Sequence, residues 1–324
     1  MLAELRSALG FARLRDVPLY ARRLTGLAVS SSDDFLPPID PAVGRRLSGI
    51  ARAVRGPDAP PAIFVHGVLP RSGTNYLADM LELHPDVFAY PGRIWEFPLL
   101  RVADACTAAQ AEFTYAFHRN AEVMTPWDML AYVASGWLAA MQAEAGGRRI
   151  LLKSPHVQNI GLFRHLFPDD ILLLCLRDGR DVIQSSLRTF KRWPLGKSFR
   201  QMATEWRHGT DAILSFQPGG PNATPNAHVV YYEELVCNPA AAMRRVIGHA
   251  RLDPEVYDFA RLASLPVRGS SAVATQGEAR WQPHEKPRDF APVGRWKAWP
   301  PHRLSRFQAL AGDALRRAGY EPAP

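Results

Sequence analysis

The hexapeptide PRSGTN combines an arginine, a glycine and three hydroxyl or amide side chains directly after the apolar run AIFVHGV. Gly73 permits a turn in which successive N–H groups face one anion, and the helix that follows adds the partial positive charge of its N-terminus. Arg71 offers planar donors that suit a tetrahedral oxyanion, and Ser72, Thr74 and Asn75 offer further hydrogen bonds. These residues predict an anion-binding loop, with an ordinary capped glycine turn as the alternative.

The anion is not expected to be a triphosphate. Nucleotide-hydrolysing loops place a lysine after their last glycine, and that lysine reaches the β- and γ-phosphates. Here Thr74 occupies this position, and the cation, Arg71, precedes the glycine. A site for a nucleoside triphosphate with magnesium is therefore disfavoured.

Two more polar segments follow apolar runs. KSPH provides Lys153 and His156 at the end of RRILLK. CLRDGRDVIQSSL provides Arg177 at the end of a second run and Ser185 eight residues later, two turns into the next helix. Arg177 and Ser185 could therefore face one phosphate from different elements. The structural alternatives are an exposed lysine, a helix-capping histidine and a solvated salt-bridge cluster around Arg177.

The neighbouring carboxylates of that cluster, Asp178 and Asp181, are expected to serve structure, with Asp as a helix cap, while Arg177 serves function. All three polar segments follow predicted strands. Ligands of parallel sheets bind at the carboxyl ends of the strands, where these loops gather. We therefore treat the three segments as one site.

The elements that must position this site alternate along the chain. Short continuous apolar strands between helices indicate an α/β fold with a P-loop-like central parallel sheet and helices on both faces. Strands are expected at 62–67, 148–153, 170–176 and 227–232. Helices are expected at 1–35, 74–83, 157–167, from Arg180, and at 197–215, 233–250, 254–263 and 301–318, with a helical pattern over 93–145. Residues 36–61 read as a Pro- and Arg-rich connector and 264–293 as irregular. The expected organisation is an N-terminal helix and connector, 1–61, and one domain, 62–324.

Four segments in order carry a resemblance to a known family: PRSGTNYLADMLELHPDV, LLKSPHVQNIGLFRHLFPD, LLLCLRDGRDVIQSSL and VVYYEELVCNPAAAMRRVI. Together with GRWKAW they resemble sulfotransferases that use 3′-phosphoadenosine-5′-phosphosulfate (PAPS), in the bacterial and tyrosylprotein-sulfotransferase-like branch. The resemblance covers about 62–320 with gaps and leaves out 1–60 and 93–147. It implies transfer of a sulfuryl group in line to an acceptor hydroxyl or amine, without a metal.

The resemblance also implies roles. The PRSGTN loop would hold the 5′-phosphosulfate, with Arg71 and Thr74 nearest the transferring group, and Lys153 would reach the leaving phosphate. The remaining contacts to the donor would come from Arg177 and Ser185 at the 3′-phosphate, Tyr232 against the adenosine, and Arg295 or Lys297 closing over it. This agrees with the chemistry, since sulfuryl transfer requires mainly positioning and cations where charge builds on the leaving oxygen.

The general base departs from the family pattern. Tyrosylprotein sulfotransferases carry a glutamate shortly after HPDV, but that position holds Gly92 here, and the nearest carboxylate is Glu96. Cytosolic members use a histidine two residues after the lysine, where this chain has Pro155 and then His156. We expect His156 to be the base, because histidine titrates near neutral pH, and Glu96 to be second. The segment before GRWKAW lacks the family's arginine-lysine-glycine triplet, so Arg288 or Arg295 is expected to substitute.

Composition narrows the alternatives. The 324 residues carry a net charge of +8, without a run of five or six basic residues, which favours an anionic ligand over nucleic acid. The three cysteines lack a disulfide or zinc spacing, and no metal is expected. The absence of a signal or an apolar span predicts a cytoplasmic protein. Leu2, Leu5 and Leu9 share one face of a basic amphipathic segment, which would pack on the domain or on a partner subunit, or would contact a membrane surface.

The acceptor is left open among small molecules, lipids, carbohydrates and peptides. The aromatic-rich 93–145 segment and the 264–293 loop are expected to roof its pocket. Two rivals to the sulfotransferase are a P-loop-type nucleotide kinase or NTPase, which the missing lysine disfavours, and a non-enzymatic basic binding module. The oligomeric state is not readable from the sequence.

Overall fold

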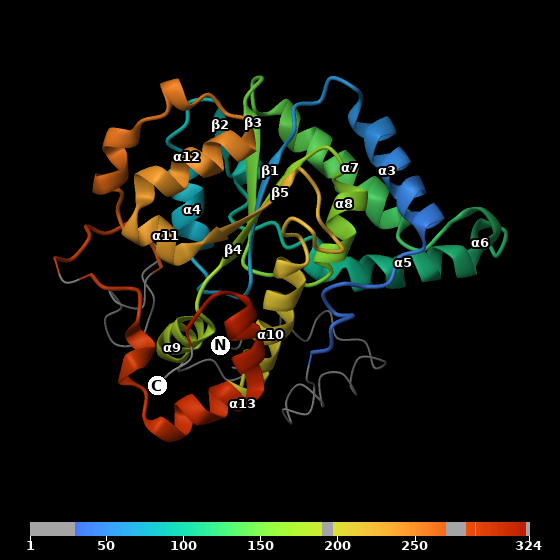
Figure 1. Ribbon diagram of the computed structural model, residues 1–324. Coiled ribbons are helices and arrows are strands. Elements are labelled where there is room, and N and C mark those ends of the chain that lie inside the picture. Colours follow the sequence, from blue (N-terminus) through green and yellow to red (C-terminus); the bar gives the residue numbers. More distant parts are fainter. Residues whose placement is uncertain (1–29, 190–196, 270–282, 289, 322–324) are drawn as a thin grey trace, which may run out of the picture.

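The computed structural model describes residues 30–189, 197–269, 283–288 and 290–321. Five strands form one sheet in the order β2-β3-β1-β4-β5, and every pair is parallel. The strands are β1 (Ile63–Gly67), β2 (Val87–Ala89), β3 (Arg149–Ser154), β4 (Ile171–Leu176) and β5 (Ala227–Tyr231). The predicted α/β class, with a central parallel sheet between helices, is confirmed (Figure 1).

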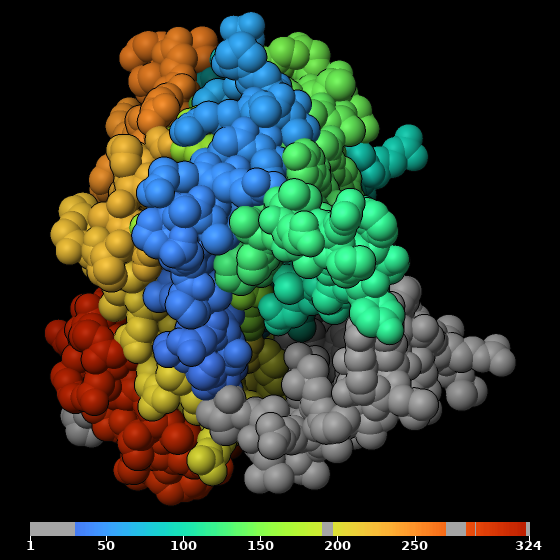
Figure 2. Space-filling model, turned by 90° about the vertical axis from the view of Figure 1, so that its right-hand side faces the viewer, coloured from blue at the N-terminus to red at the C-terminus, as the bar shows by residue number. Residues whose placement is uncertain are grey.

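Alternation along the buried central strand separates two cores. Ile63 and Val65 of β1 pack toward the side of α4 (Thr74–Leu81) and α12 (Pro239–Ala250). Phe64, between them, packs toward the side of α3 (Pro41–Arg55), α7 (Asp128–Ala143) and α8 (Phe163–Leu166). Side chains of a strand alternate between faces, so one short apolar run supplies both layers. On the second side α3 lies against α7 (Figure 2).

The remaining helices complete the two layers and the ends of the sheet. They are α5 (Ala103–Ala116), α6 (Asn120–Val123), α9 (Gly179–Thr189), α10 (Phe199–Leu214), α11 (Tyr232–Cys237) and α13 (Pro301–Arg317). Short 3-10 turns lie at Pro91–Arg93, Leu100–Val102, Ile160–Leu162, Pro254–Val256, Phe259–Ser264 and Arg295–Ala298. No helix in the described ranges is long and apolar enough to cross a membrane.

The expected connector over 36–61 is wrong for its central part, because α3 occupies Pro41–Arg55. The Asp40 side chain accepts hydrogen bonds from the Ala42 and Val43 amides and so caps this helix. Pro41 sits at the first helical position, where its fixed φ favours a helix start and its missing N–H costs nothing. A proline that resembled a breaker in the sequence is therefore part of a start signal.

Other boundaries also differ. The edge strand β2 was not expected, since its three residues are too short for a periodic pattern. Of the helix expected over 157–167, residues 157–159 are not helical, and Asn159 is left-handed with a φ of 55°; the 3-10 turn at Ile160–Leu162 and the short α8 follow. The helix expected over 254–263 is two 3-10 turns. Of the helix expected over 1–35, residues 1–29 lie outside the described ranges, and residues 30–35 form bends and turns.

Candidate active site

Hydrogen bonds within the loop after β1 hold its conformation. The Ser72 side chain accepts a hydrogen bond from the Leu69 amide (3.0 Å) and donates one to the Leu69 carbonyl. Arg71 has a φ of 85° and Gly73 a φ of 99°, so two left-handed residues turn the chain before α4 begins. Such turns point successive amides to one side, next to the positive end of the helix. Ser72 thus shapes the predicted anion loop rather than lining it.

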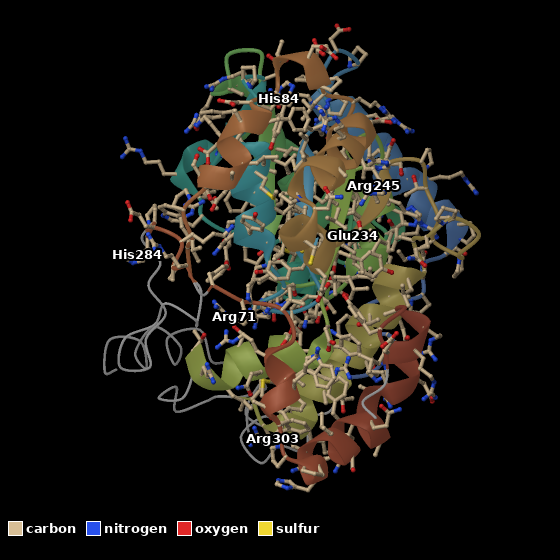
Figure 3. The ribbon with its side chains drawn as sticks, turned by 60° about the vertical axis from the view of Figure 1, so that its left-hand side comes forward. Arg71, His84, Glu234, Arg245, His284 and Arg303 are labelled. Atoms are coloured by element: carbon tan, nitrogen blue, oxygen red, sulfur yellow. The ribbon has the colours of Figure 1, made fainter. Side chains whose placement is uncertain are left out.

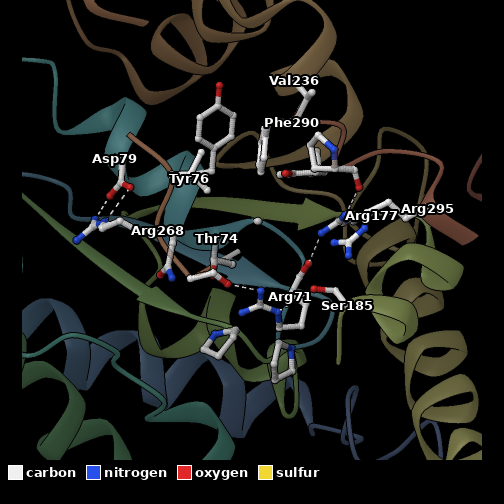
Figure 4. A pocket seen from close by; sticks show the side chains of 18 of the residues that line it. Arg71, Thr74, Tyr76, Asp79, Arg177, Ser185, Val236, Arg268, Phe290 and Arg295 are labelled. Carbon is white, nitrogen blue, oxygen red and sulfur yellow. Dashed lines mark hydrogen bonds and ion pairs between the residues drawn. The ribbon is translucent and has the colours of Figure 1, made fainter. Parts of the chain in front are cut away.

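Arginines converge on this loop from several elements. The Arg71 Nε donates to the Ser185 hydroxyl of α9 (3.0 Å), and its guanidinium also donates to the Gly269 carbonyl. Arg177, at the end of β4, donates to the Arg71 carbonyl (2.9 Å) and to the Pro292 carbonyl (2.6 Å). Figure 4 shows Arg71, Arg177 and Ser185 together with Arg295 on one side of the pocket.

This cluster concentrates positive charge in a partly dry place. Burial, together with repulsion from Arg177 and Arg295, lowers the pKa of Arg71 to about 10. Arg71 lies near the centre of the molecule, whereas Arg245 pairs with Glu234 elsewhere on the surface and Arg303 lies on α13 (Figure 3). A bound anion with several charges would relieve the repulsion between the clustered guanidiniums.

Tyr232 forms the wall beside the loop. Its ring lies under the Arg177 guanidinium at 4.3 Å, and it meets Tyr76 edge-on, with 6.3 Å between ring centres. A Cβ added to Gly73 would lie 2.2 Å from Tyr232 Cδ2, so only glycine fits between the loop and this ring. The loop and an aromatic face are thereby placed side by side, as a nucleotide with a phosphate and a flat base requires.

Residues 294–296 are held by Asp178 and Asp181 of the RDGRD sequence, so both carboxylates have structural roles, although these contacts were not expected from the sequence. Asp181 accepts hydrogen bonds from the Gly294 amide (2.7 Å) and the Trp296 amide (3.0 Å). Asp178 is paired with Arg180, whose guanidinium also covers the Trp296 ring at 3.5 Å. The two aspartates therefore fix residues 294–296 over the arginine cluster.

Three predicted residues lie at the opposite end of the loop. Lys153 Nζ is 3.7 Å from the Glu96 carboxylate, and the Glu96 side chain is 45% exposed whereas that of Lys153 is buried. Burial lowers the pKa of Lys153, and Glu96 opposes this effect. His156 Nε2 is 2.8 Å from an Arg101 nitrogen. Arginine can only donate, so Nε2 accepts and the ring proton is placed on Nδ1.

These surroundings keep His156 neutral. Burial, followed by the repulsion of Arg101, Lys197 and His66, lowers the pKa of His156 to about 2. The neighbouring His66 donates a hydrogen bond from Nδ1 to the His156 carbonyl (2.8 Å), and burial lowers the pKa of His66 to about 4. A neutral imidazole whose acceptor nitrogen is already engaged is poorly suited to take up a proton.

The cluster and this second end share one cavity of about 380 Å³, within the usual range for small-molecule sites. It brings together ten of the thirteen predicted site residues: Arg71, Gly73, Thr74, Asn75, Glu96, His156, Arg177, Ser185, Tyr232 and Arg295. Ser72 and Lys153 do not line it but support residues that do. Lys297 is exposed and does not line it, because it lies two positions beyond Arg295 on a turn of three residues and faces another way.

Sequence reasoning missed an ion pair in this cavity. Asp79 of α4 accepts a hydrogen bond from Arg268 Nε (2.9 Å), and both residues are largely buried. Arg268 also donates to the Tyr90 hydroxyl (2.6 Å) and lies near the ring of Trp95, at 6.0 Å. Figure 4 shows the pair on the side opposite Arg177. No signal in the sequence joins residues 189 positions apart.

The donor set fits a dianionic or trianionic nucleotide better than a metal. In the described part of the chain, no group of three or more His, Cys, Asp or Glu side chains is placed to hold a metal ion. At Gly73 the loop lies too close to the Tyr232 ring for any side chain, and three arginines lie beside it. This arrangement suits a phosphosulfate joined to a nucleoside.

Comparisons with known proteins agree with this site. Residues 61–255 match the model of the sulfotransferase family. The chain is 25% identical over 323 residues to protein-tyrosine sulfotransferase A of Caenorhabditis elegans, covering 96% of this chain and 80% of that protein. It is 24% identical over 272 residues to protein-tyrosine sulfotransferase 2 of Gallus gallus, covering 81% and 70%.

A solved structure shows the same fold. The sulfotransferase domain from the olefin synthase of Synechococcus PCC 7002 superposes with a TM-score of 0.52 at 20% identity, covering 82% of this chain and 96% of that domain. The family match spans the anion loop, β3, β4 and β5, which position most of the residues that line the cavity, whereas Arg268 and Arg295 lie beyond the match. The chain belongs to the sulfotransferase family, and the prediction of a PAPS-dependent sulfotransferase, rather than a nucleotide kinase, is confirmed.

Proposed function

We propose that the cavity holds PAPS across the loop after β1 and transfers its sulfuryl group to a phenolic hydroxyl of a peptide or protein. The observation that carries this proposal is the convergence of Arg71, Arg177, Ser185 and Arg295 beside the cradle of Gly73 and Tyr232. The 5′-phosphosulfate lies against the loop amides, with Arg71 and Thr74 nearest the sulfur.

The nucleoside end is held by residues that directly follow β4 and β5 and by a residue of α9. Arg177 and Ser185 bind the 3′-phosphate, since both line the arginine side of the cavity. Tyr232 lies against the adenosine. Arg295 closes over the donor from the segment that Asp181 holds in place. Hydrogen bonds from a charged guanidinium to an anion are stronger than those between neutral groups. Such bonds suit PAPS, which carries two separate anionic groups.

Glu96 acts as the general base in this proposal, rather than His156. The acceptor oxygen attacks sulfur, its proton passes to the Glu96 carboxylate, and the bond from sulfur to the bridging phosphate oxygen breaks. Lys153 lies 3.7 Å from Glu96 and directs an ammonium toward the charge that builds on the leaving phosphate. His156 is kept neutral by burial and Arg101, and its Nδ1 has no hydrogen-bond partner among the described residues, so it takes no part in the proton transfer.

A large acceptor suits the exposure of this end of the cavity. The Glu96 side chain is 45% exposed, so the proton acceptor lies near the surface, where a side chain of a peptide can reach it. The ring of Trp95, which is tilted by 51° against that of Tyr90 with 4.8 Å between centres, offers an aromatic surface for a phenol. The similarity to tyrosine sulfotransferases of animals supports the same class of acceptor.

The donor is tested by thermal stabilisation. Adenosine 3′,5′-bisphosphate at ten to a hundred times its Kd should stabilise the fold by about 1.4–2.7 kcal/mol, and ATP with Mg²⁺ should not. Stabilisation by ATP with Mg²⁺ alone would overturn the donor assignment. Transfer of labelled sulfate from PAPS to a tyrosine peptide, compared with the matching phenylalanine peptide and with a serine peptide, tests the acceptor. Transfer to serine but not tyrosine would overturn the phenolic assignment while leaving the donor intact.

A further inference from the structure

The exposed apolar side chains of the described residues are concentrated in one segment. Outside it only two large ones, Val54 and Val256, are exposed. The others all lie between residues 95 and 137: Trp95, Val102, Phe113, Tyr115, Phe117, Val123, Tyr132, Val133 and Trp137. Tyr115 is 87% exposed, the highest value among these side chains. We use the name aromatic surface for the members of this set from Phe113 to Trp137. They lie on α5, α6 and α7, and Phe117 directly follows α5.

The helix that carries much of this surface has little packing of its own. Of the 14 residues of α5, only Ala103 and Gln110 are buried. Helices of this length draw most of their stability from packing one face against the rest of the protein. In Figure 2 the atoms of α5 to α7 form part of one side of the molecule, next to α3. Large exposed apolar surfaces of this kind mark interaction sites.

The charge of this segment indicates the kind of partner. Between residues 95 and 137 the exposed charged side chains are four acidic ones, Glu96, Asp104, Glu112 and Glu122, and two basic ones, Arg101 and Arg119, which gives a net charge of −2. This is unusual in a chain whose net charge is +8. An anionic lipid surface or an acidic peptide is therefore disfavoured, and a basic segment with an apolar face is favoured.

The chain itself contains such a segment. Residues 1–29 carry five arginines and two carboxylates, with leucines at positions 2, 5 and 9. The described chain begins close to the aromatic segment: the Asn159 amide donates to the Asp34 carbonyl (2.9 Å), and the Asn159 side chain donates to the Leu100 carbonyl (3.0 Å). One residue thus ties the start of the described chain to the start of the segment that includes α5. A stretch of 29 residues has ample reach, since a helix rises about 1.5 Å per residue.

We infer that residues 1–29 pack against the aromatic surface of α5–α7 in the same chain. Their leucine face covers Phe113, Phe117 and the exposed rings of α7, and their arginines pair with the acidic residues of α5 and α6. The segment thereby supplies the packing that α5 otherwise lacks. This inference concerns residues outside the cavity, so it stands independently of the donor and the acceptor.

A photo-crosslinker identifies the partner directly in the full chain. Phe117 is replaced by p-benzoylphenylalanine, and crosslinked peptides are mapped by mass spectrometry; the same replacement at Val256, which is also half exposed, is the control. A mixture of isotopically light and heavy protein separates contacts within one chain from contacts between chains. We expect crosslinks to residues 1–29 of the same chain, at least tenfold above the control. Crosslinks mainly to a second chain, or none above the control, would overturn the inference.

Protease protection provides a second measurement without the crosslinker. Trypsin cleaves after the arginines of residues 1–29, and packing should slow this cleavage. The double substitution Phe113→Asp and Phe117→Asp should raise the cleavage rate in that segment at least tenfold, whereas Val256→Asp should leave it unchanged. Equal rates in the native chain and the double variant would contradict the inference. Both sites are exposed, so the fold itself should persist, which an unchanged near-ultraviolet circular dichroism spectrum of the double variant would verify.

Discussion

The substitution Gly73→Ala is the most direct test of the contact between the loop after β1 and the Tyr232 ring. The added methyl group would lie 2.2 Å from Tyr232 Cδ2, at a backbone φ of 99°. Tyr232 cannot retreat freely, because its ring is buried and lies under Arg177 at 4.3 Å. The change therefore acts on the loop and on the aromatic wall together.

Two costs add. An L-residue with left-handed backbone costs about 1–2 kcal/mol. Forcing an extra methyl group into a packed site costs about 1–3 kcal/mol more. The free energy of unfolding should therefore fall by roughly 2–5 kcal/mol. Displacement of the Tyr232 ring should also weaken binding of adenosine 3′,5′-bisphosphate at least tenfold, which corresponds to about 1.4 kcal/mol.

A matched control separates the two costs. Gly219 also has a left-handed φ, +84°, but nothing lies within 4 Å of a Cβ added there. Gly219→Ala should show the backbone cost alone, in urea unfolding, and should leave nucleotide binding by calorimetry unchanged. Combining Gly73→Ala with Tyr232→Ala should recover the stability that the clash removes. Equal losses of stability at Gly73 and Gly219, with unchanged nucleotide affinity in both, would refute the described contact between loop and ring.

Further predictions follow from the two ends of the cavity. Arg177→Lys keeps the charge but loses two hydrogen bonds, and hydrogen bonds to charged groups contribute about 1.5–3 kcal/mol. The affinity for adenosine 3′,5′-bisphosphate, measured by calorimetry, should therefore fall about 10- to 100-fold. An unchanged Kd would contradict the role of Arg177 in binding the nucleotide. Glu96→Gln should lower kcat at least a hundredfold with little change in melting temperature, whereas His156→Gln should lower kcat less than tenfold; the reverse order would restore His156 as the base. The folded chain holds His66 at a pKa of about 4 and His156 at about 2, below the 6.5 of the unfolded chain. Unfolding therefore takes up protons as the pH falls through 6.5, and stability should fall by about 3 kcal/mol between pH 6.5 and 5 in urea titrations, half of it absent in His156→Gln. A flat profile would show that neither imidazole is held neutral.

Much of the anion end was predictable because its signals are local. Strand, turn and helix start all lie within a dozen residues around Gly73, and the family resemblance places Arg177 and Ser185 beside it. Sequence reasoning was weaker for the acceptor end. The ion pair of Asp79 and Arg268 joins distant positions, and the environment of His156 depends on Arg101, which comes from another element. Histidine was expected to titrate near neutral pH, and burial, invisible in a sequence, removes that property.

The errors in the predicted secondary structure also arise from contacts that the sequence pattern does not show. Pro41 resembled a breaker until the Asp40 side chain was seen to cap the helix that it starts. Conversely, the sequence 157–167 had the composition of one helix, yet tertiary contacts hold Asn159 in a left-handed conformation and divide it. Local propensity is a weak guide where a tertiary contact determines the backbone.

The strand order has a consequence for how such a chain can diversify. With β1 at the centre, Arg177 and Tyr232 come from the β4–β5 half, whereas Lys153, His156 and Glu96 come from the β3–β2 half. In the proposed function, residues of one half would bind the nucleotide, residues of the other half would bind the acceptor, and only the loop after β1 would contact both. Substitutions and insertions between β2 and β3 can therefore exchange one acceptor for another while the donor half stays under constant selection. A single architecture can in this way yield many substrate ranges from one unchanging donor chemistry.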